Sequence, residues 1–336
     1  PHDTYYIYDD FGNLTYVLSP KVTINDGISA TELNELCYQY VYDHRNRLVE
    51  KKVPGKGWEY IIYNKLDRPV MTQDAELRAQ NNWLITKYDS FGRVAITGVH
   101  NQPGAFTRST MQNDYADNTV AYTQYIERTE SATPLGGGQI YYTNTTLPHT
   151  ITTLHTVNYY DSYVDTDGLS VPSTILGQAK ATRSQGLPTV SKVRVLGTND
   201  WITTITGYDT KGMAIYTASK NNYLNTTDIV ETELDFGGKV VRTKNTHKKT
   251  GNSDIVTEDS FTYDHAGRLL RQKQKINGQP IETLFDNTYD NLGQLAQKTV
   301  GGGLQTVDYA YNGRGWLKKI NNPNSLGNDL FAFGIN

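Results

Sequence analysis

Cysteine is almost absent from this 336-residue chain, which contains only Cys37. A single cysteine excludes an internal disulfide framework and any metal site that needs several cysteine ligands. Long apolar runs are missing as well, since no stretch reaches the 18 residues that a membrane-spanning helix requires. The 32 lysines and arginines against 35 aspartates and glutamates also lack the basic excess of a nucleic-acid-binding protein. We therefore expect no membrane span and no nucleic-acid partner.

Motifs for catalysis and cofactor binding are missing too. There is no Gly-x-Ser-x-Gly nucleophile elbow, and the glycine runs 136–138 and 301–303 are not followed by the Lys-Ser/Thr of a phosphate loop. The seven histidines have no metal-ligand spacing with cysteine or acidic partners. Calcium loops need several acids close together. The sequence therefore predicts no enzymatic activity, no cofactor and no metal site.

Tyrosine and glycine are abundant instead. The chain has 25 tyrosines against 8 phenylalanines, together with 29 glycines. Tyrosine favours strands, whereas glycine favours tight turns. This composition predicts an all-β protein with many short strands.

A short motif, Tyr-Asp-x-x-Gly-Arg-Leu, recurs along the chain. Within the blocks before residue 99 and after residue 205, its copies start 21 to 34 residues apart. Repetition at this interval is typical of one supersecondary unit used many times. The clear copies start at Tyr8, Tyr88, Tyr263 and Tyr289, a fifth with a changed tail starts at Tyr208, and looser copies start at Tyr42, Tyr63, Leu234 and Tyr311.

The motif has the spacing of a hairpin turn. A type I turn prefers aspartate at its first position and glycine at its fourth. The carboxylate can accept a hydrogen bond from the backbone two residues on, and the glycine can adopt the left-handed conformation of a G1 bulge. Asn46 and Asp67 replace glycine in two copies, and both residue types tolerate that conformation. The predicted turn residues are Asp9, Gly12, Asp43, Asn46, Asp89, Gly92, Asp209, Gly212, Asp264, Gly267, Asp290 and Gly293.

The repeats divide the chain into four predicted regions. Residues 1–98 and 206–322 are blocks of hairpins, and residues 99–205 are an irregular β-rich region that bridges them. Residues 323–336 begin a further strand region. We expect the hairpins to lie side by side in one curved strip, which each hairpin lengthens by roughly 10 Å. The chain starts without methionine and stops in an apolar run, so we expect a segment of a longer polypeptide.

Over residues 1–98 and 206–322 the motif resembles the YD-repeat, or Rhs-repeat, family. The resemblance implies a strip of antiparallel β-hairpins that spirals into a hollow, cocoon-like shell. Similar shells occur in bacterial Rhs polymorphic toxins, in the cocoon of insecticidal toxin complexes and in teneurins. In the bacterial proteins the shell encloses a toxic C-terminal domain. This chain contains no Asp-Pro dipeptide, so the aspartyl self-cleavage of many family members is not carried over.

The resemblance implies a structural, encapsulating segment of a large secreted or cell-surface bacterial protein that acts in bacterial competition. Its expected partner is the rest of its own parent chain, namely further shell repeats and a C-terminal effector domain. The secretion machinery and surface glycans stay open as further partners. One alternative is a surface adhesin or glycan-binding module, because exposed tyrosines can stack on sugar rings. A second alternative is an enzyme whose site lies in residues 99–205. Fold resemblance alone does not choose among these functions.

Overall fold

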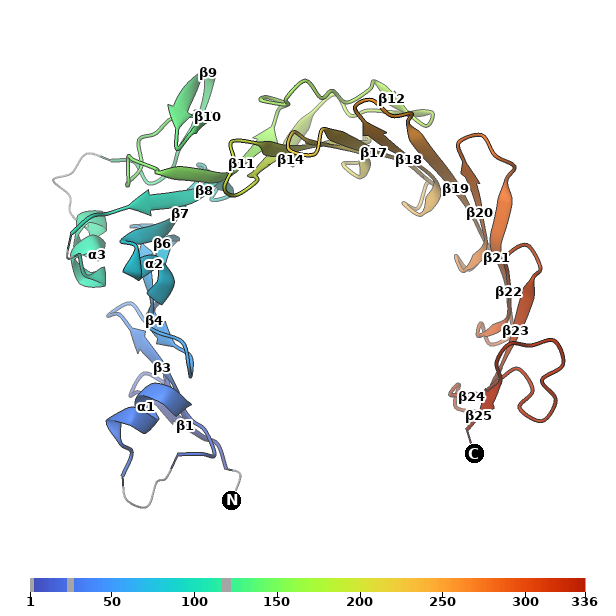
Figure 1. Ribbon diagram of the computed structural model, residues 1–336, viewed down its shortest axis with the longest axis horizontal. Coiled ribbons are helices and arrows are strands. Elements are labelled where there is room, and N and C mark those ends of the chain that lie inside the picture. The colour runs from blue at the N-terminus through green and yellow to red at the C-terminus, as the bar shows by residue number, and fades with distance from the viewer. Residues whose placement is uncertain (1–2, 23–26, 105, 117–121, 336) are drawn as a thin grey trace. The chain divides into compact units, whose positions relative to one another are not determined.

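Antiparallel β-hairpins dominate the computed structural model, which describes residues 3–22, 27–104, 106–116 and 122–335 (Figure 1). Of the described residues, 51% lie in strands and 7% in helices. Twenty-one of the described strands belong to one antiparallel sheet. The predicted all-β class, built from antiparallel hairpins, is confirmed. The chain divides into two compact units, Pro1–Tyr159 with Ser191–Asn199, and Tyr160–Val190 with Asp200–Asn336.

In the first unit, consecutive strands from β1 to β8 pair in chain order, and β11 then pairs with β8. The sheet strands are β1 (Tyr5–Tyr8), β2 (Leu14–Leu18), β3 (Cys37–Tyr42), β4 (Leu48–Lys52), β5 (Glu59–Tyr63), β6 (Pro69–Gln73), β7 (Asn82–Tyr88), β8 (Val94–Asn101) and β11 (Thr153–Asp161). A separate two-stranded sheet contains β9 (Arg128–Leu135) and β10 (Gly138–Tyr142).

Short helices interrupt this unit between strands. They are α1 (Ala30–Leu36), α2 (Ala75–Ala79) and α3 (Arg108–Ala116). A capping box starts α1, because the Glu32 amide donates to the Ser29 hydroxyl and the Ser29 amide donates to the Glu32 carboxylate. The α3 helix docks on β5 through the Gln112 amide, which accepts from the Tyr63 N–H at 3.0 Å and donates to the Tyr63 carbonyl at 2.8 Å. Gln112 thus satisfies the backbone of Tyr63 much as a neighbouring strand would.

The hydrophobic core of the first unit lies under β7, β8 and β11. Trp83 and Ile85 of β7 are at most 2% exposed, and Ile96 of β8 and Leu154 of β11 are fully buried. Cys37 is a fully buried free thiol that packs with Leu18 and other apolar residues. The burial of these side chains removes apolar surface from water and so stabilises this unit.

In the second unit the strands again pair in chain order, from β15 to β25. They are β15 (Trp201–Tyr208), β16 (Ala214–Asn221), β17 (Thr226–Leu234), β18 (Val240–Lys249), β19 (Ile255–Tyr263), β20 (Leu269–Ile276), β21 (Glu282–Tyr289), β22 (Leu295–Val300), β23 (Gln305–Tyr311), β24 (Leu317–Ile320) and β25 (Phe333–Gly334). Before them come β12 (Thr174–Ile175) and β13 (Gln178–Ala179), followed by β14 (Ser184–Arg194), which belongs to this unit as far as Val190.

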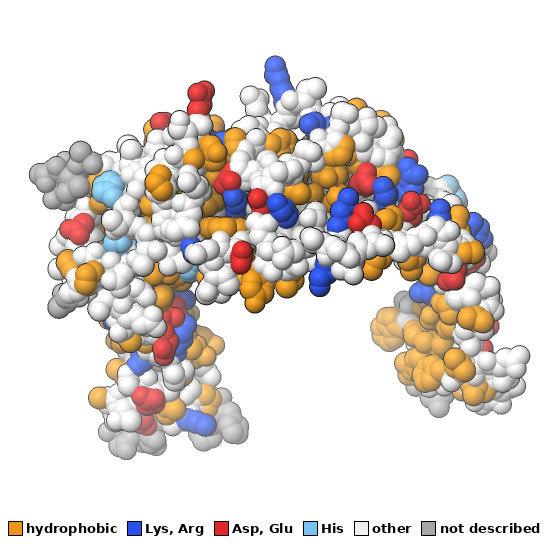
Figure 2. Space-filling view, turned by 45° about the horizontal axis from the view of Figure 1, so that its top comes forward, with side chains coloured by type: hydrophobic (Ala, Val, Ile, Leu, Met, Phe, Trp, Pro, Cys, Tyr) orange, Lys and Arg blue, Asp and Glu red, His pale blue; other side chains and the backbone are white. Residues whose placement is uncertain are grey.

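In the second unit the burial of apolar side chains ends at β16, and the β12–β13 hairpin lies against β17 and β18 through bonds of Gln178 and Leu176. Among the described residues that follow Ala218, no hydrophobic side chain is buried. Oppositely charged residues face each other across strands instead, as in the pair Lys244–Glu231 at 3.1 Å and the pair Arg242–Glu233 at 3.0 Å. Such opposite cross-strand pairs each stabilise a sheet by a few tenths of a kcal/mol up to about 1 kcal/mol. Figure 2 shows acidic and basic side chains interspersed on the face that it displays.

Candidate functional site

The Tyr-Asp motif forms a closed hydrogen-bonded turn, which is seen clearly at Asp89. The Asp89 N–H donates to the Arg93 carbonyl, and the Gly92 N–H donates to the Asp89 carbonyl, both at 3.0 Å. The carboxylate oxygen Oδ1 of Asp89 accepts from the Phe91 N–H at 3.0 Å and from the Arg93 N–H at 2.9 Å. Gly92 has a φ of +81°, in the left-handed region. The side chain and the backbone of one aspartate therefore hold four hydrogen bonds of this turn.

All nine motif copies have this arrangement. In each copy, the N–H of the first turn residue donates to the carbonyl four residues on, and its own carbonyl accepts from the N–H three residues on. Its side-chain oxygen accepts from the N–H four residues on. The turns start at Asp9, Asp43, Asn64, Asp89, Asp209, Asp235, Asp264, Asp290 and Asn312. The fourth turn residue has a positive φ throughout, at Gly12, Asn46, Asp67, Gly92, Gly212, Gly238, Gly267, Gly293 and Gly315.

The motif arginine returns to its own aspartate. The Arg268 Nε donates to Asp264 at 2.6 Å, and Arg93 pairs with Asp89 in the same way at the same distance. The pKa of Asp264 is lowered, first by the hydrogen bond from the Arg268 backbone amide and then by its guanidinium, which together outweigh desolvation. The turn aspartate is thus held in its charged, accepting form.

In five copies the motif tyrosine joins its turn to the one before it. The Tyr289 hydroxyl donates to the Leu269 carbonyl of the preceding hairpin at 2.9 Å, and the Arg268 guanidinium carbon lies 4.6 Å from the centre of the Tyr289 ring. We call this contact the joint: a tyrosine hydroxyl on the carbonyl that lies five residues after the preceding turn's first residue. Four further joints are Tyr63–Leu48, Tyr88–Pro69, Tyr263–Val240 and Tyr311–Leu295.

The joint explains a second requirement for glycine. A Cβ at Gly293 would lie 2.9 Å from Nη1 of Arg268, and a Cβ at Gly92 would lie 2.6 Å from Nη2 of Arg68. Both arginines come from the preceding hairpin. Glycine therefore permits the left-handed turn and also the close approach of the neighbouring arginine.

Replacing Gly92 with valine tests both requirements. We expect Gly92→Val to lower the free energy of unfolding by about 2–3 kcal/mol, because the left-handed conformation strains a β-branched residue and Arg68 must leave the Tyr88 ring. Gly12→Val is the matched control, since Gly12 has a φ of +83° but no atom within 4 Å of the place that a Cβ would occupy. In Gly12→Val the free energy of unfolding should fall only by the cost of the backbone strain, about 1–2 kcal/mol. Equal losses in urea unfolding would show that the Arg68 contact contributes nothing.

The first two turns are not among the five joined pairs, and a groove lies between them. Asn13 stands where four other copies have arginine, and its side-chain amide donates to Asp9 at 3.0 Å and to Asn46 of the next turn at 3.3 Å. A groove of about 630 Å³ lies here. Burial raises the pKa of the Tyr42 phenol, and the nearby Tyr40 and Asp9 add to the effect. The groove is lined by Asp9, Phe11, Thr15, Tyr16, Tyr40, Val41, Tyr42, Asp43, His44 and Asn46.

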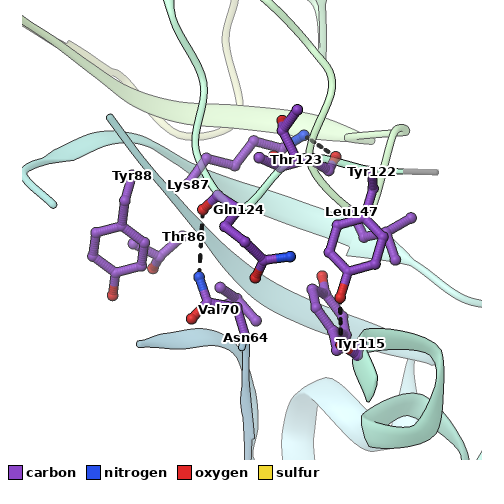
Figure 3. Close-up of a pocket in the computed structure, with 11 residues that line it drawn as sticks. Asn64, Val70, Thr86, Lys87, Tyr88, Tyr115, Tyr122, Thr123, Gln124 and Leu147 are labelled. Carbon is purple, nitrogen blue, oxygen red and sulfur yellow. Dashed lines mark hydrogen bonds between the residues drawn. The ribbon is translucent and has the colours of Figure 1, made fainter. Parts of the chain in front are cut away.

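A buried lysine lies beside a small cavity in the first unit (Figure 3). The Lys87 Nζ donates to the Asn144 side chain at 2.7 Å and to the carbonyls of Thr146 and Pro148 at 3.0 and 2.8 Å. All three acceptors are neutral, and burial lowers the pKa of Lys87 to about 7. The cavity measures about 10 Å³, which is room for no more than a water molecule. The sequence analysis did not identify Lys87, because no sequence motif marks this residue as functional.

The shifted pKa of Lys87 predicts a pH-dependent stability. Between about pH 7 and the ordinary lysine value near 10.5, the unfolded chain binds a proton that the folded chain does not. Stability should therefore rise with pH across this window, by up to about 1.4 kcal/mol per pH unit, and be flat below it. Lys87→Met should remove this slope in urea unfolding measured from pH 6 to pH 10. Parallel pH profiles for the two proteins would contradict the assignment.

Metal-ligand clusters are absent from the described residues, where no three histidine, cysteine, aspartate or glutamate side chains are grouped as metal ligands would be. In the same part of the chain, none of the helices has both the length and the apolar character needed to cross a membrane.

Comparison with known proteins gives similarity to toxin-complex structures. No family model and no curated protein matches the chain. Among solved structures it is similar to TcdB2-TccC3-Cdc42, with 13% identity over 94% of this chain and 15% of that chain and a TM-score of 0.32. It is also similar to TcdB2-TccC3 without the hypervariable C-terminal region, with 12% identity, the same coverage of both chains and the same TM-score. A Photorhabdus luminescens Tc holotoxin pore matches with 11% identity over 94% of this chain and 21% of that chain, at a TM-score of 0.24. The chain therefore spans about a fifth or less of these proteins, and scores at this level do not assign a function.

Proposed function

We propose that this chain is a structural, non-catalytic segment of a YD-repeat shell. The shell would belong to a large secreted or cell-surface bacterial protein of Rhs type and would house a C-terminal effector domain. The observation that carries the proposal is the repeated joint, which ties five tyrosine hydroxyls to the backbone of the hairpin before them. Each joint uses a tyrosine at the same motif position and a carbonyl at the same place after the preceding turn. The same contact can therefore add one hairpin after another, side by side, as a wall requires.

The polar character of the second unit also supports a wall. Its strands after β16 contain no buried hydrophobic side chain among the described residues, and charged pairs lie across them. A sheet of this kind can have solvent on both faces, as the wall of a hollow shell has. A compact enzyme domain would instead bury one face of such a sheet.

Protease protection of the enclosed domain tests this proposal. The complete open reading frame would be expressed, and limited proteolysis of the segment beyond the shell would be followed by mass spectrometry. We expect that segment to resist cleavage, and the double substitution Arg268→Ala with Tyr289→Ala to expose it by opening one joint. Tyr223→Ala, at an exposed loop tyrosine, is the control that should leave protection unchanged. A segment cleaved equally fast in all three proteins would overturn the encapsulating function.

The groove beside Asn13 favours glycan binding as a second candidate function. Its four aromatic rings offer stacking faces, while the carboxylates of Asp9 and Asp43 can accept bonds from sugar hydroxyls. Calorimetric titration with chitotetraose, cellotetraose and sialyllactose tests it. Tyr42→Ala should weaken any binding at least tenfold, whereas Tyr38→Ala, in the same strand but outside the groove, should not. Equal affinities in both variants, or no binding to any of these sugars, would reject the groove as a glycan site.

A further inference from the structure

A pocket of about 310 Å³ lies in the first unit, where residues of α1, of α2 and of the loop between β4 and β5 meet. It shares no lining residue with the groove beside Asn13. Its charged lining residues are three basic ones and a single acidic one, namely Lys52, Lys56, Arg78 and Glu35. This excess of positive charge favours an anionic ligand.

The β4–β5 loop and α2 form one wall of the pocket. Gly57 of the loop comes so close to α2 that a Cβ there would lie 2.6 Å from the Cβ of Ala75. The Arg78 Nη1 donates to the Trp58 carbonyl at 3.0 Å, and the guanidinium carbon lies 4.6 Å from the centre of the Tyr60 ring. Among the described residues, Arg78 forms no ion pair with a carboxylate. These contacts fix the position of the guanidinium and leave its charge uncompensated.

Lys52, at the end of β4, is buried without a partner. Only 5% of its surface is exposed, and its side chain forms no hydrogen bond or ion pair with any described residue. The side chain of its cross-strand neighbour, Gln39, donates to the Leu33 carbonyl at 2.8 Å instead. Burying an ammonium group without a counter-charge is unfavourable. An anion in the pocket would supply the missing partner of Lys52.

Lys56 can add a third positive charge without leaving a carboxylate unpaired. It forms an ion pair with Glu59, and its side chain is 52% exposed. Glu59 also pairs with Lys51 at 2.8 Å, and it keeps this partner if Lys56 moves to a ligand. Lys52, Arg78 and Lys56 together match the charge of about −2 that a phosphate monoester carries near neutral pH.

We propose that this pocket binds the phosphate monoester of a small molecule. The phosphate oxygens accept from the Lys52 Nζ and from the remaining N–H groups of Arg78, and Lys56 closes over them from the loop. The organic part of the ligand lies along the Trp58 indole, which lines the same pocket. The inference is independent of the encapsulating and glycan-binding functions, since it uses no residue of the turns, the joints or the groove.

Calorimetric titration with four probes tests the proposal. Phenyl phosphate carries both the dianion and a ring, methyl phosphate and inorganic phosphate carry the charge without a ring, and phenol carries the ring without the charge. We expect phenyl phosphate to bind about tenfold more tightly than methyl phosphate or inorganic phosphate, because its ring can stack on Trp58, and phenol not to bind. No binding of phenyl phosphate, or equal binding of phenol, would overturn the proposal.

Side-chain variants locate the binding in this pocket. Lys52→Met keeps the length of the buried chain and removes its charge, so it should weaken phenyl phosphate about tenfold or more and raise the urea midpoint of the free protein. Lys318→Met, at an exposed lysine of β24, is the control that should change neither. Trp58→Leu should lower the affinity for phenyl phosphate to that for methyl phosphate. Unchanged affinity for phenyl phosphate in Lys52→Met or in Trp58→Leu would refute the assignment of the pocket.

Discussion

Asp89→Ala should lower the free energy of unfolding by about 3 kcal/mol or more. Asp89 is only 5% exposed, and its carboxylate accepts two backbone N–H groups and the Arg93 guanidinium. Removing it leaves two turn amides without this acceptor and takes the Asp89 carboxylate away from the partly buried Arg93 guanidinium. Loss of one partner of a buried ion pair typically costs about 3–5 kcal/mol. Urea unfolding followed by tryptophan fluorescence measures the change.

Asp9→Ala is the matched control for this prediction. Asp9 forms the same turn in the same unit, but its carboxylate is more accessible and bonds Asn13 where Asp89 bonds an arginine. Its removal should therefore destabilise the protein clearly less than the removal of Asp89. If both substitutions had the same effect, the stability of these turns would come from backbone hydrogen bonds alone.

Trp83→Ala should be the most damaging single substitution in the core of the first unit. Trp83 is 2% exposed and is the largest of the fully buried side chains. Truncation of a buried tryptophan costs about 3–5 kcal/mol, since apolar contact is lost and a cavity remains. The transition midpoint in urea should fall accordingly.

Leu84→Ala provides the comparison, because Leu84 is the next residue of β7, on the opposite face of the strand, and is 40% exposed. Its truncation should cost less than about 1 kcal/mol. A loss for Leu84→Ala as large as that for Trp83→Ala would mean that both faces of β7 are covered in solution.

The sequence is most informative about features that depend on neighbours along the chain. The all-β class and the hairpins follow from alternation and from the Asp-to-Gly spacing, because turn hydrogen bonds close within five residues. The capping box at Ser29 and Glu32 is equally local, and it could have indicated α1, which the strand pattern does not reveal.

Contacts between distant residues could not be predicted in the same way. The motif shows that Tyr289 recurs at a fixed place, but not that its hydroxyl bonds Leu269, 20 residues earlier. Lys87 gives no signal at all, since its acceptors lie 57 to 61 residues away in an irregular segment. Only the folded chain brings such groups together.

The sheet after β18, in which no described hydrophobic side chain is buried, has a mechanical consequence. Each hairpin there is held by its two neighbours and not by a shared core, so the energy that resists separation is spread evenly along the strip. A pulling force applied at one end should detach these hairpins one after another, in a series of small and similar steps. The core-bearing strands β7 and β8 should instead yield in one larger event. Such a strip can lose its outermost hairpin and re-form it while the rest of the sheet stays intact.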